Sequence, residues 1–291
     1  MTPLTHLINM SIYKGEVPSA LKIAKVIPIY KKGDKGEYGN YRPISLLPTF
    51  SKIYEKIIHK RLYSYVINRS IIYESQYGFR QGHSTVNAIS ELIENIIEGF
   101  DKQESTLAVF LDLSKAFDTI DHSILLKKLE FYGIRGKALD WFVSYLKNRQ
   151  QFVSLDGHNS ETLDIKCGVP QGSVLGPLLF IIYTNDLPHT LKHSKSILFA
   201  DDTNLFKTSK DISELFNHVN SDLKVITEWF YSNHLSLNTT KTHYVLFTLT
   251  KHNTTSQHIY LGGTLIERKQ YVRFLGILVD DKLSWKYHID S

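Results

Sequence analysis

Two adjacent aspartates interrupt an apolar stretch, Ser196-Ile197-Leu198-Phe199-Ala200-Asp201-Asp202-Thr203-Asn204-Leu205-Phe206. The pattern predicts two short strands joined by a tight turn, a position that tolerates aspartate. Neighbouring carboxylates repel each other unless a cation lies on them. Carboxylate oxygens suit Mg²⁺, which often binds one or two protein carboxylates together with substrate phosphates. The pair therefore points to a metal site, and a solvated Asp-Asp turn is the competing interpretation.

A second acidic residue stands near the end of another apolar strand, Leu107-Ala108-Val109-Phe110-Leu111-Asp112-Leu113. An ionised aspartate at the end of a buried strand is unfavourable without a partner. Asp112 is therefore a candidate metal ligand that faces a cleft. It precedes Asp201 by 201 − 112 = 89 positions, so only the fold can bring the two together.

The composition is that of a globular protein. The chain has 291 residues, 42% of them hydrophobic, and a formal net charge of +5, which is compatible with a polyanionic partner. Its single cysteine, Cys167, excludes an internal disulfide and a cysteine zinc site and suits a reducing compartment. We find no secretory signal and no bilayer-spanning run, and we expect an intracellular protein, nuclear or cytoplasmic, that does not bind a membrane.

Hydrophobic periodicity predicts further elements along the chain. We expect a strand over 26–30 followed by a basic, turn-rich stretch over 31–45. Helices are expected over 50–68, 86–100, 123–132, 138–147 and 212–235, and a hairpin is expected over 151–166. A Gly/Pro-rich loop over 168–177 opens a helix to 185, and strands follow over 243–248, 258–261 and 271–279. The apolar stripe of the helix over 86–100, from Val86 to Phe100, is expected to pack in the core.

Three blocks then occur in order: Phe-Leu-Asp-Leu-Ser-Lys-Ala-Phe-Asp at 110–118, Gly-Val-Pro-Gln-Gly-Ser at 168–173 and Phe-Ala-Asp-Asp-Thr at 199–203. Supporting blocks lie at 40–45, 76–80, 235–242 and 274–276. In this order they resemble motifs A, B and C, the fingers blocks and motifs D and E of the reverse transcriptases of non-LTR (LINE-type, jockey-like) retrotransposons. The resemblance implies an RNA-directed DNA polymerase whose partners are an RNA template, a DNA primer and dNTPs.

The resemblance also implies a fold and a domain order. We expect an α+β right-hand polymerase with an antiparallel palm sheet backed by helices, helical fingers and a thumb that is essentially missing. Fingers are expected over 1–85, palm with motif A over 86–118, and a connecting insertion over 119–155. Palm with motifs B, C and D is expected over 156–262. Motif E, the primer grip, and the truncated start of the thumb are expected over 263–291.

By this resemblance Asp112, Asp201 and Asp202 are the catalytic carboxylates. They would bind two Mg²⁺ ions, for which Mn²⁺ could substitute, and the backbone carbonyl of Leu113 would be a further ligand. The metals would lower the pKa of the primer 3′-hydroxyl and hold the leaving phosphates.

Further residues are assigned to the nucleotide by the same resemblance. Phe117 would be a steric gate against a ribose 2′-hydroxyl, with plain core packing as its competing role. Gln171 and Gly172 would shape the nucleotide pocket.

Cations and a primer grip complete the implied site. Arg42 and one of Lys31 or Lys32 would neutralise the triphosphate, unless these cations touch only template phosphate. Lys241 would approach the pyrophosphate as a general acid, and Arg80 would contact the template backbone. The primer end would be held by Phe274, Leu275 and Gly276.

Three departures from the family pattern make the chain read as a fragment: almost no thumb, no preceding endonuclease domain and no Cys/His knuckle. A catalytically silent remnant with residual RNA binding is one alternative. An RNA-dependent RNA polymerase is another, although such enzymes typically have glycine where Ala200 stands and no bulky gate at Phe117. A phosphatase-like two-aspartate site would leave the block at 168–173 unexplained.

Overall fold

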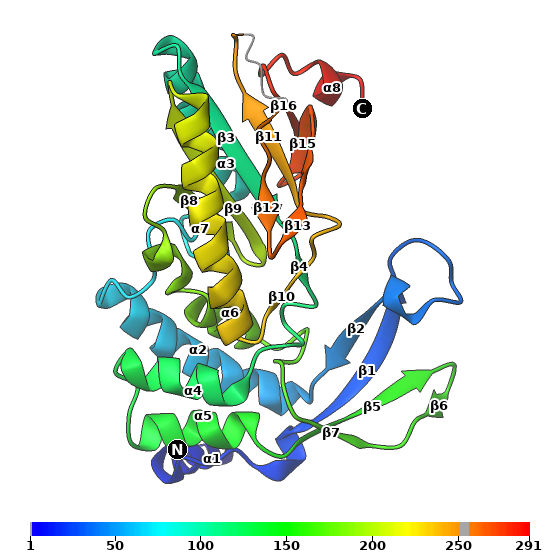
Figure 1. Cartoon of the computed structure of the whole chain (residues 1–291). Helices are drawn as coiled ribbons and strands as arrows, with labels where there is room; N and C mark the ends of the chain where they lie inside the picture. The colour runs from blue at the N-terminus through cyan, green and yellow to red at the C-terminus, as the bar shows by residue number, and fades with distance from the viewer. Residues whose placement is uncertain (1, 251–255) are drawn as a thin grey trace. The chain divides into compact units, whose positions relative to one another are not determined.

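The computed structural model describes residues 2–250 and 256–291, which form two compact units (Figure 1). Unit 1 comprises Met1–Ile72 and Phe117–Tyr183, and unit 2 comprises Tyr73–Ala116 and Thr184–Ser291. The units divide the chain differently from the predicted domains, since residues 156–183, expected in the palm, belong to unit 1. Within the described residues, no helix is long and apolar enough to cross a membrane.

Unit 2 is built on a five-stranded sheet with the order β14-β11-β3-β9-β8. The five strands of this sheet are β3 (Ser105–Leu111), β8 (Lys195–Phe199), β9 (Asp202–Ser209), β11 (His243–Phe247) and β14 (Glu267–Arg268). Unit 2 also contains three two-stranded sheets: β4 (Leu113–Ser114) with β10 (Ser236–Leu237), β12 (Tyr260–Leu261) with β13 (Thr264–Leu265), and β15 (Tyr271–Phe274) with β16 (Ile277–Asp280). Its helices are α3 (Thr85–Asp101), α7 (Ile212–Ser232) and α8 (Lys286–Ile289). The two strands beside β3 both run antiparallel to it.

The central strand β3 is buried along its whole length because helices cover both faces of the sheet. Side chains alternate between the faces. Ala108 and Phe110 lie in one cluster with Leu92 and Ile96 of α3. The other face meets α7, whose apolar positions are buried as the sequence predicts. A strand held in this way ends at a fixed point, and Asp112 follows directly.

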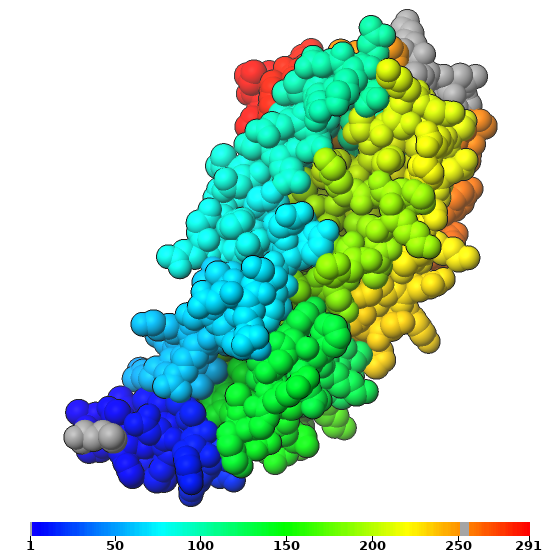
Figure 2. Space-filling view, turned by 90° about the vertical axis from the view of Figure 1, so that its left-hand side faces the viewer, coloured from blue at the N-terminus to red at the C-terminus, as the bar shows by residue number. Residues whose placement is uncertain are grey.

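Helix α3 begins at the predicted position, with Ser84 and Asn87 forming a reciprocal capping box. Part of its expected core stripe is wrong. Leu92 is fully buried, but Val86 and Ile97 are 66% and 46% exposed. Their positions on the helix lie well away from the line of contact with the sheet. Figure 2 shows the outer side of α3, in blue-green, at the molecular surface.

The strand expected over 271–279 is wrong, because it is the hairpin of β15 and β16. The chain reverses at Leu275-Gly276, a two-residue turn in which both residues have positive φ. This hairpin packs on the α3 side of the sheet through Phe274, whose ring meets the Phe110 ring edge-on at 5.6 Å. Periodicity alone missed the reversal because both arms carry apolar residues.

Unit 1 combines helices with a mixed sheet in which β2-β1-β5-β6 are neighbours and β7 also pairs with β5. Its helices are α1 (Pro3–Lys14), α2 (Thr49–Asn68), α4 (His122–Phe131), α5 (Lys137–Leu146) and α6 (Gly176–Tyr183). Its strands are β1 (Ile23–Tyr30), β2 (Tyr41–Leu46), β5 (Arg149–Leu155), β6 (His158–Asn159) and β7 (Leu163–Ile165). The predicted helices and the hairpin over 151–166 are confirmed. The turn-rich reading of 31–45 is correct only to residue 40, because 41–46 is strand β2.

A buried carboxylate ties α2 to the start of α6. Glu55 is 1% exposed, and its Oε2 accepts hydrogen bonds from the backbone N–H groups of Val174 and Leu175 at 2.5 and 3.3 Å. Its Oε1 accepts from the Tyr145 hydroxyl at 3.2 Å. A carboxylate at a helix N-terminus satisfies donors that otherwise have no partner. Glu55 thereby fixes the end of the loop over 168–173.

Candidate active site

The two adjacent aspartates stand at the tip of the β8–β9 hairpin in unit 2. Phe199 and Asp202 form the last pair of the hairpin, so the turn is Ala200-Asp201. The expected Asp201-Asp202 tip is therefore displaced by one residue, and Asp202 is the first residue of β9. Ala200 has φ +57°, a left-handed conformation that residues other than glycine adopt at a cost of about 1 kcal/mol.

The sheet register brings Asp112 to the same end of unit 2. Leu111 and Thr203 are the last pair between β3 and β9. The pairing ends there, and Asp112 and Asp202 are the next residues on the two chain segments, close enough for the Asp112 charge to act on Asp202. The three candidate carboxylates thus lie at the same end of one sheet, where β3 and β8 end and β9 begins.

The backbone of Asp112 is held by the turn that follows β10. Its N–H donates to Thr242 Oγ1 at 3.3 Å, and its carbonyl accepts from the Asn238 N–H at 2.8 Å. Leu113 pairs with Leu237, which leaves its proposed role as a carbonyl ligand a prediction. The same turn brings Lys241 Nζ to 3.8 Å from Asp112 Oδ2.

The carboxylates influence one another electrostatically. The pKa of Asp202 is raised to about 6, first because the surrounding protein desolvates its carboxyl group and then because Asp201 and Asp112 carry negative charge. The residue still has exposed surface, so water screens part of the repulsion. This edge of the sheet therefore attracts positive charge.

The donor set suits a magnesium ion in its chemistry. Three carboxylates supply hard oxygen ligands, and a cation would offset the desolvation and the charge repulsion that raise the pKa of Asp202. Within residues 2–250 and 256–291, however, no three acidic, histidine or cysteine side chains converge closely enough to hold an ion as they stand. Binding would therefore require the carboxylates to rotate toward a shared cation.

The raised pKa of Asp202 predicts a pH-dependent stability in the absence of metal. The folded state binds this proton more tightly than the unfolded chain, so the stabilisation is complete below about pH 4 and is lost as the pH rises through about 6. In EDTA at pH 7–8, Asp202→Asn should raise the midpoint of thermal unfolding by roughly 2 °C. Thermal melts of both proteins between pH 4 and 8 check this.

The control for that experiment is Asp156→Asn, which changes an exposed aspartate in another two-residue hairpin turn. Its melting profile should follow that of the unaltered protein. Equal profiles for Asp202→Asn and Asp156→Asn would contradict the raised pKa of Asp202.

The remaining nucleotide-site candidates belong to unit 1, where a glycine-rich loop meets the residues after motif A. The Phe117 carbonyl accepts from the Val169 N–H at 2.9 Å, and the Phe117 ring stacks on Phe180 with centroids 4.7 Å apart. Phe180 is fully buried in α6, whereas Phe117 is half-buried. One side of the Phe117 ring is thus fixed by the core of unit 1.

Gln171 and Gly172 connect this loop to its neighbours. Gln171 Nε2 donates to both carboxylate oxygens of Asp118 at 3.0 and 3.1 Å, and the Gln171 carbonyl accepts from the Ser45 N–H at 2.7 Å. Gly172 has φ +116°, and a Cβ there would lie 2.7 Å from the Ser45 carbonyl oxygen. The loop is therefore bound to β2 by a contact that only glycine permits.

The predicted cations lie on the β1–β2 hairpin. Lys31 and Lys32 are exposed at its tip, and Arg42 is exposed on β2, three residues before Ser45. That spacing is roughly 10 Å along a strand. Unit 1 therefore connects Arg42 to Gln171 through one strand, while the two lysines lie further out on the hairpin.

Two residues that are predicted to contact template or primer, Arg80 and Phe274, make contacts inside unit 2. The Arg80 Nη1 atom donates to the carbonyls of Tyr73, Glu74 and Gln76 at 3.0–3.2 Å, which gives Arg80 an internal role in unit 2. Phe274 is 2% exposed in the core. Only the Leu275-Gly276 turn of that block reaches the surface, and a primer contact there remains a prediction.

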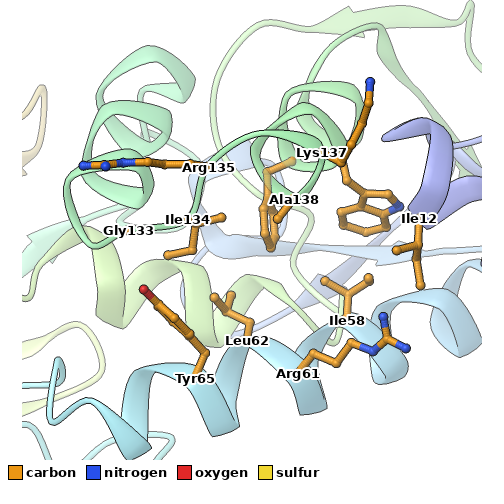
Figure 3. A pocket seen from close by; sticks show the side chains of 12 residues that line it. Ile12, Ile58, Arg61, Leu62, Tyr65, Gly133, Ile134, Arg135, Lys137 and Ala138 are labelled. Carbon is orange, nitrogen blue, oxygen red and sulfur yellow. The ribbon is translucent and has the colours of Figure 1, made fainter.

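An apolar pocket in unit 1 is a separate feature (Figure 3). Its volume is about 280 Å³, and none of the predicted site residues lines it. Leu62 of α2 and Trp141 of α5 contribute to its wall, and Arg61 and Arg135 to its lining. This pocket is therefore separate from the candidate carboxylates, which belong to unit 2.

Sequence reasoning missed three residues that hold the candidates in position: Asn238, Thr242 and Asp118. The first two fix the Asp112 backbone, and the third binds Gln171. Asn238 and Thr242 lie in a polar turn that also contains Lys241, and this polar turn could have indicated their role. Nothing in the sequence links Asp118 to a glutamine 53 positions later.

Comparison with known proteins gives a consistent result. The family described as reverse transcriptase (RNA-dependent DNA polymerase) matches residues 29–279. A probable RNA-directed DNA polymerase from transposon BS of Drosophila melanogaster is 34% identical over 288 residues, which cover 94% of this chain and 31% of the relative. The RNA-directed DNA polymerase from mobile element jockey of the same species is 32% identical and covers 99% and 32%. The chain thus spans about a third of the length of these relatives.

Solved structures of telomerase share the fold. A telomerase from Candida albicans in complex with a fragment of telomeric RNA has a TM-score of 0.64 at 16% identity, covering 96% of this chain and 50% of that chain. An apo telomerase from Candida tropicalis has a TM-score of 0.61 at 12% identity, covering 91% and 54%. At these identities the likeness concerns the fold alone, and it confirms the α+β polymerase fold expected from the sequence.

Proposed function

The chain belongs to the reverse transcriptase family, as a domain of the kind found in non-LTR retrotransposon RNA-directed DNA polymerases, and we propose that it adds deoxynucleotides to a primer 3′-hydroxyl on an RNA template. One observation carries the proposal: the antiparallel register of β3 and β9 ends at Leu111 and Thr203, which brings Asp112, Asp201 and Asp202 to the same end of the sheet. An RNA template, a DNA primer and dNTPs are accordingly the proposed partners.

Asp112, Asp201 and Asp202 are the proposed ligands of two Mg²⁺ ions, with Mn²⁺ as a substitute. Bound divalent ions would supply Lewis acidity toward the reacting phosphate and lower the pKa of the primer hydroxyl. The carboxylates would hold these ions, and the hydrogen bonds to the Asp112 backbone fix the position from which the Asp112 carboxylate extends.

The unit 1 residues have proposed roles in nucleotide selection. Phe117 would exclude a ribose 2′-hydroxyl, and Gln171 with Gly172 would shape the pocket for the incoming nucleotide. Arg42, with Lys31 or Lys32, would neutralise triphosphate charge. Their exposure on β2 and on the hairpin tip supports contact with a polyanion.

Lys241 is the proposed general acid toward the pyrophosphate leaving group. An ammonium 3.8 Å from Asp112 Oδ2 lies beside the candidate metal site, and positioned acids contribute roughly 10²-fold or more to rate. Lys241→Ala should therefore lower the maximal extension rate by roughly 10²-fold, and Lys241→Arg should restore little of it because arginine does not release its proton. Single-turnover rates measured across pH check this.

If Lys241→Arg extends as fast as the unaltered protein, the residue acts as a fixed charge and not as a proton donor. Substitution of Lys210, an exposed lysine after β9, is the control and should leave the rate unchanged.

Primer extension on an RNA template tests the function itself. Purified protein with Mg²⁺, a labelled DNA primer and dNTPs at low salt should lengthen the primer, and EDTA should stop it. Low salt matters because contacts with phosphate weaken steeply as salt rises. Binding of RNA without any extension would favour the catalytically silent alternative, and faster incorporation of NTPs than dNTPs would favour an RNA polymerase.

A further inference from the structure

A short segment after α2 lies along the outer edge of the unit 2 sheet, beside β8. The Leu198 N–H donates to the Ser75 carbonyl at 2.9 Å, and the Tyr77 N–H donates to the Leu198 carbonyl at 2.7 Å. Residue 76 forms a parallel bridge with Leu198. The segment thus covers the open edge of β8 one residue before the strand ends at the carboxylate turn.

The side chain between these two hydrogen bonds reaches the turn itself. Gln76 is 1% exposed, and its Oε1 accepts from the Gly78 N–H at 2.8 Å and from the Ala200 N–H at 3.3 Å. Two converging N–H donors require an acceptor, which fixes the orientation of the amide. Its Nε2 has no hydrogen-bond partner in the part of the chain that the structure describes. Burying an unpaired donor is unfavourable, so the two hydrogen bonds that Oε1 accepts must offset this cost.

The neighbouring glycine brings the two backbones into direct contact. A Cβ at Gly78 would lie 2.2 Å from the Ala200 nitrogen, closer than any side chain permits. Arg80 then closes the segment on itself through its bonds to the carbonyls of Tyr73 and Gln76. The brace formed by residues 73–80 is therefore rigid where it meets the turn.

We propose that Gln76 is a positioning residue that holds the backbone of the Ala200-Asp201 turn, from which the Asp201 carboxylate can rotate to bind a divalent cation. The proposal rests on the function proposed above. Ala200 has φ +57° and needs such a restraint, because nothing in its own side chain favours that conformation. An amide suits the task because it accepts two hydrogen bonds without adding a fourth negative charge beside three carboxylates.

The test measures binding of Mn²⁺ by electron paramagnetic resonance, without nucleotide or primer. Gln76→Met removes the acceptor at similar volume. Its matched control, Ser75→Ala, removes a buried hydrogen bond to the same strand, from Ser75 to Ser196 at 2.9 Å, which does not involve the turn. We expect Gln76→Met to bind Mn²⁺ roughly 10-fold more weakly, as is typical when a group that orients a metal ligand is lost. Ser75→Ala should bind like the unaltered protein, even where urea unfolding shows that both variants are less stable.

Equal Mn²⁺ affinities for Gln76→Met and Ser75→Ala would overturn the proposal. Should Gln76→Met fail to fold, Gln76→Asn decides the matter, because it keeps the amide but withdraws its oxygen by one methylene: weaker binding supports the role and unchanged binding overturns it. Asp201→Asn is measured in parallel. If it binds Mn²⁺ as well as the unaltered protein does, the proposed carboxylate site is wrong, and the role of Gln76 falls with it.

Extension kinetics give a second readout. A residue that only positions the turn should lower the maximal rate of Gln76→Met and raise its Mg²⁺ requirement, while the KM for dNTP changes little. A change confined to the KM for dNTP would contradict a role at the carboxylate turn.

Discussion

Replacing Asp201 with asparagine should abolish primer extension, lowering the rate by roughly 10³-fold or more. Asn keeps the shape of the side chain but removes the negative charge that a divalent cation needs. Asp201 is exposed in a two-residue turn, so the substitution should leave folding intact. Gel-resolved primer extension under single-turnover conditions, with circular dichroism to verify the fold, measures the loss.

Asp156→Asn is the matched control, because Asp156 also occupies an exposed two-residue hairpin turn. It should extend the primer at the unaltered rate. An Asp201→Asn protein that extends like Asp156→Asn would rule out the assignment of Asp201 as a metal ligand, whatever the fold. Loss of activity in both would instead point to a general sensitivity of the chain to changes in its turns.

The strands that lead to the three carboxylates could be predicted from the sequence because the signal for each strand is local. Short apolar runs mark β3, β8 and β9, and the aspartates stand where these runs begin or end: Asp112 directly follows β3, Asp201 lies in the turn after β8, and Asp202 opens β9. Once the three motifs are set in one family order, the pairing of β3 with β9, which brings Asp112 and Asp202 to one end of the sheet, follows from the fold. The one-residue displacement of the turn was beyond reach, because it depends on Phe199 pairing with Asp202 in the register of the hairpin.

Positions that depend on tertiary packing, or on which neighbouring backbone groups need a hydrogen-bond donor, could not be predicted in this way. Phe274 was expected near a primer, yet it packs on Phe110, 164 positions earlier, because the reversal at Leu275 turns its side of the hairpin inward. Arg80 was expected to face template, yet its guanidinium is used by carbonyls four to seven residues before it. Each residue thus has a contact inside unit 2 that its residue type did not suggest, and the template and primer contacts stay predictions.

The position of Phe117 depends both on the local sequence motif and on a contact with a residue far along the chain, Phe180. Its place in the block at 110–118 suggested a gate, and core packing was the competing role. The structure gives it features of each, since one face of the ring stacks on buried Phe180 while the residue stays half-buried. The proposed gate requires a ring that cannot yield, and the stacking on buried Phe180 provides that support.

Phe117→Val should therefore relax sugar selection, reducing the preference for dNTP over NTP by roughly 10- to 100-fold. Valine retains part of the contact with Phe180 but withdraws the ring edge, so the gain should appear as faster NTP incorporation while the dNTP rate falls little. The ratio of kcat/KM for matched dNTP and NTP on one RNA template measures it. Phe131→Val, at a residue 81% exposed on α4, is the control for losing an aromatic ring and should leave the ratio unchanged. If Phe117→Val lowers both rates equally, the ring supports the loop over 168–173 through packing, and selection against the 2′-hydroxyl must come from another residue.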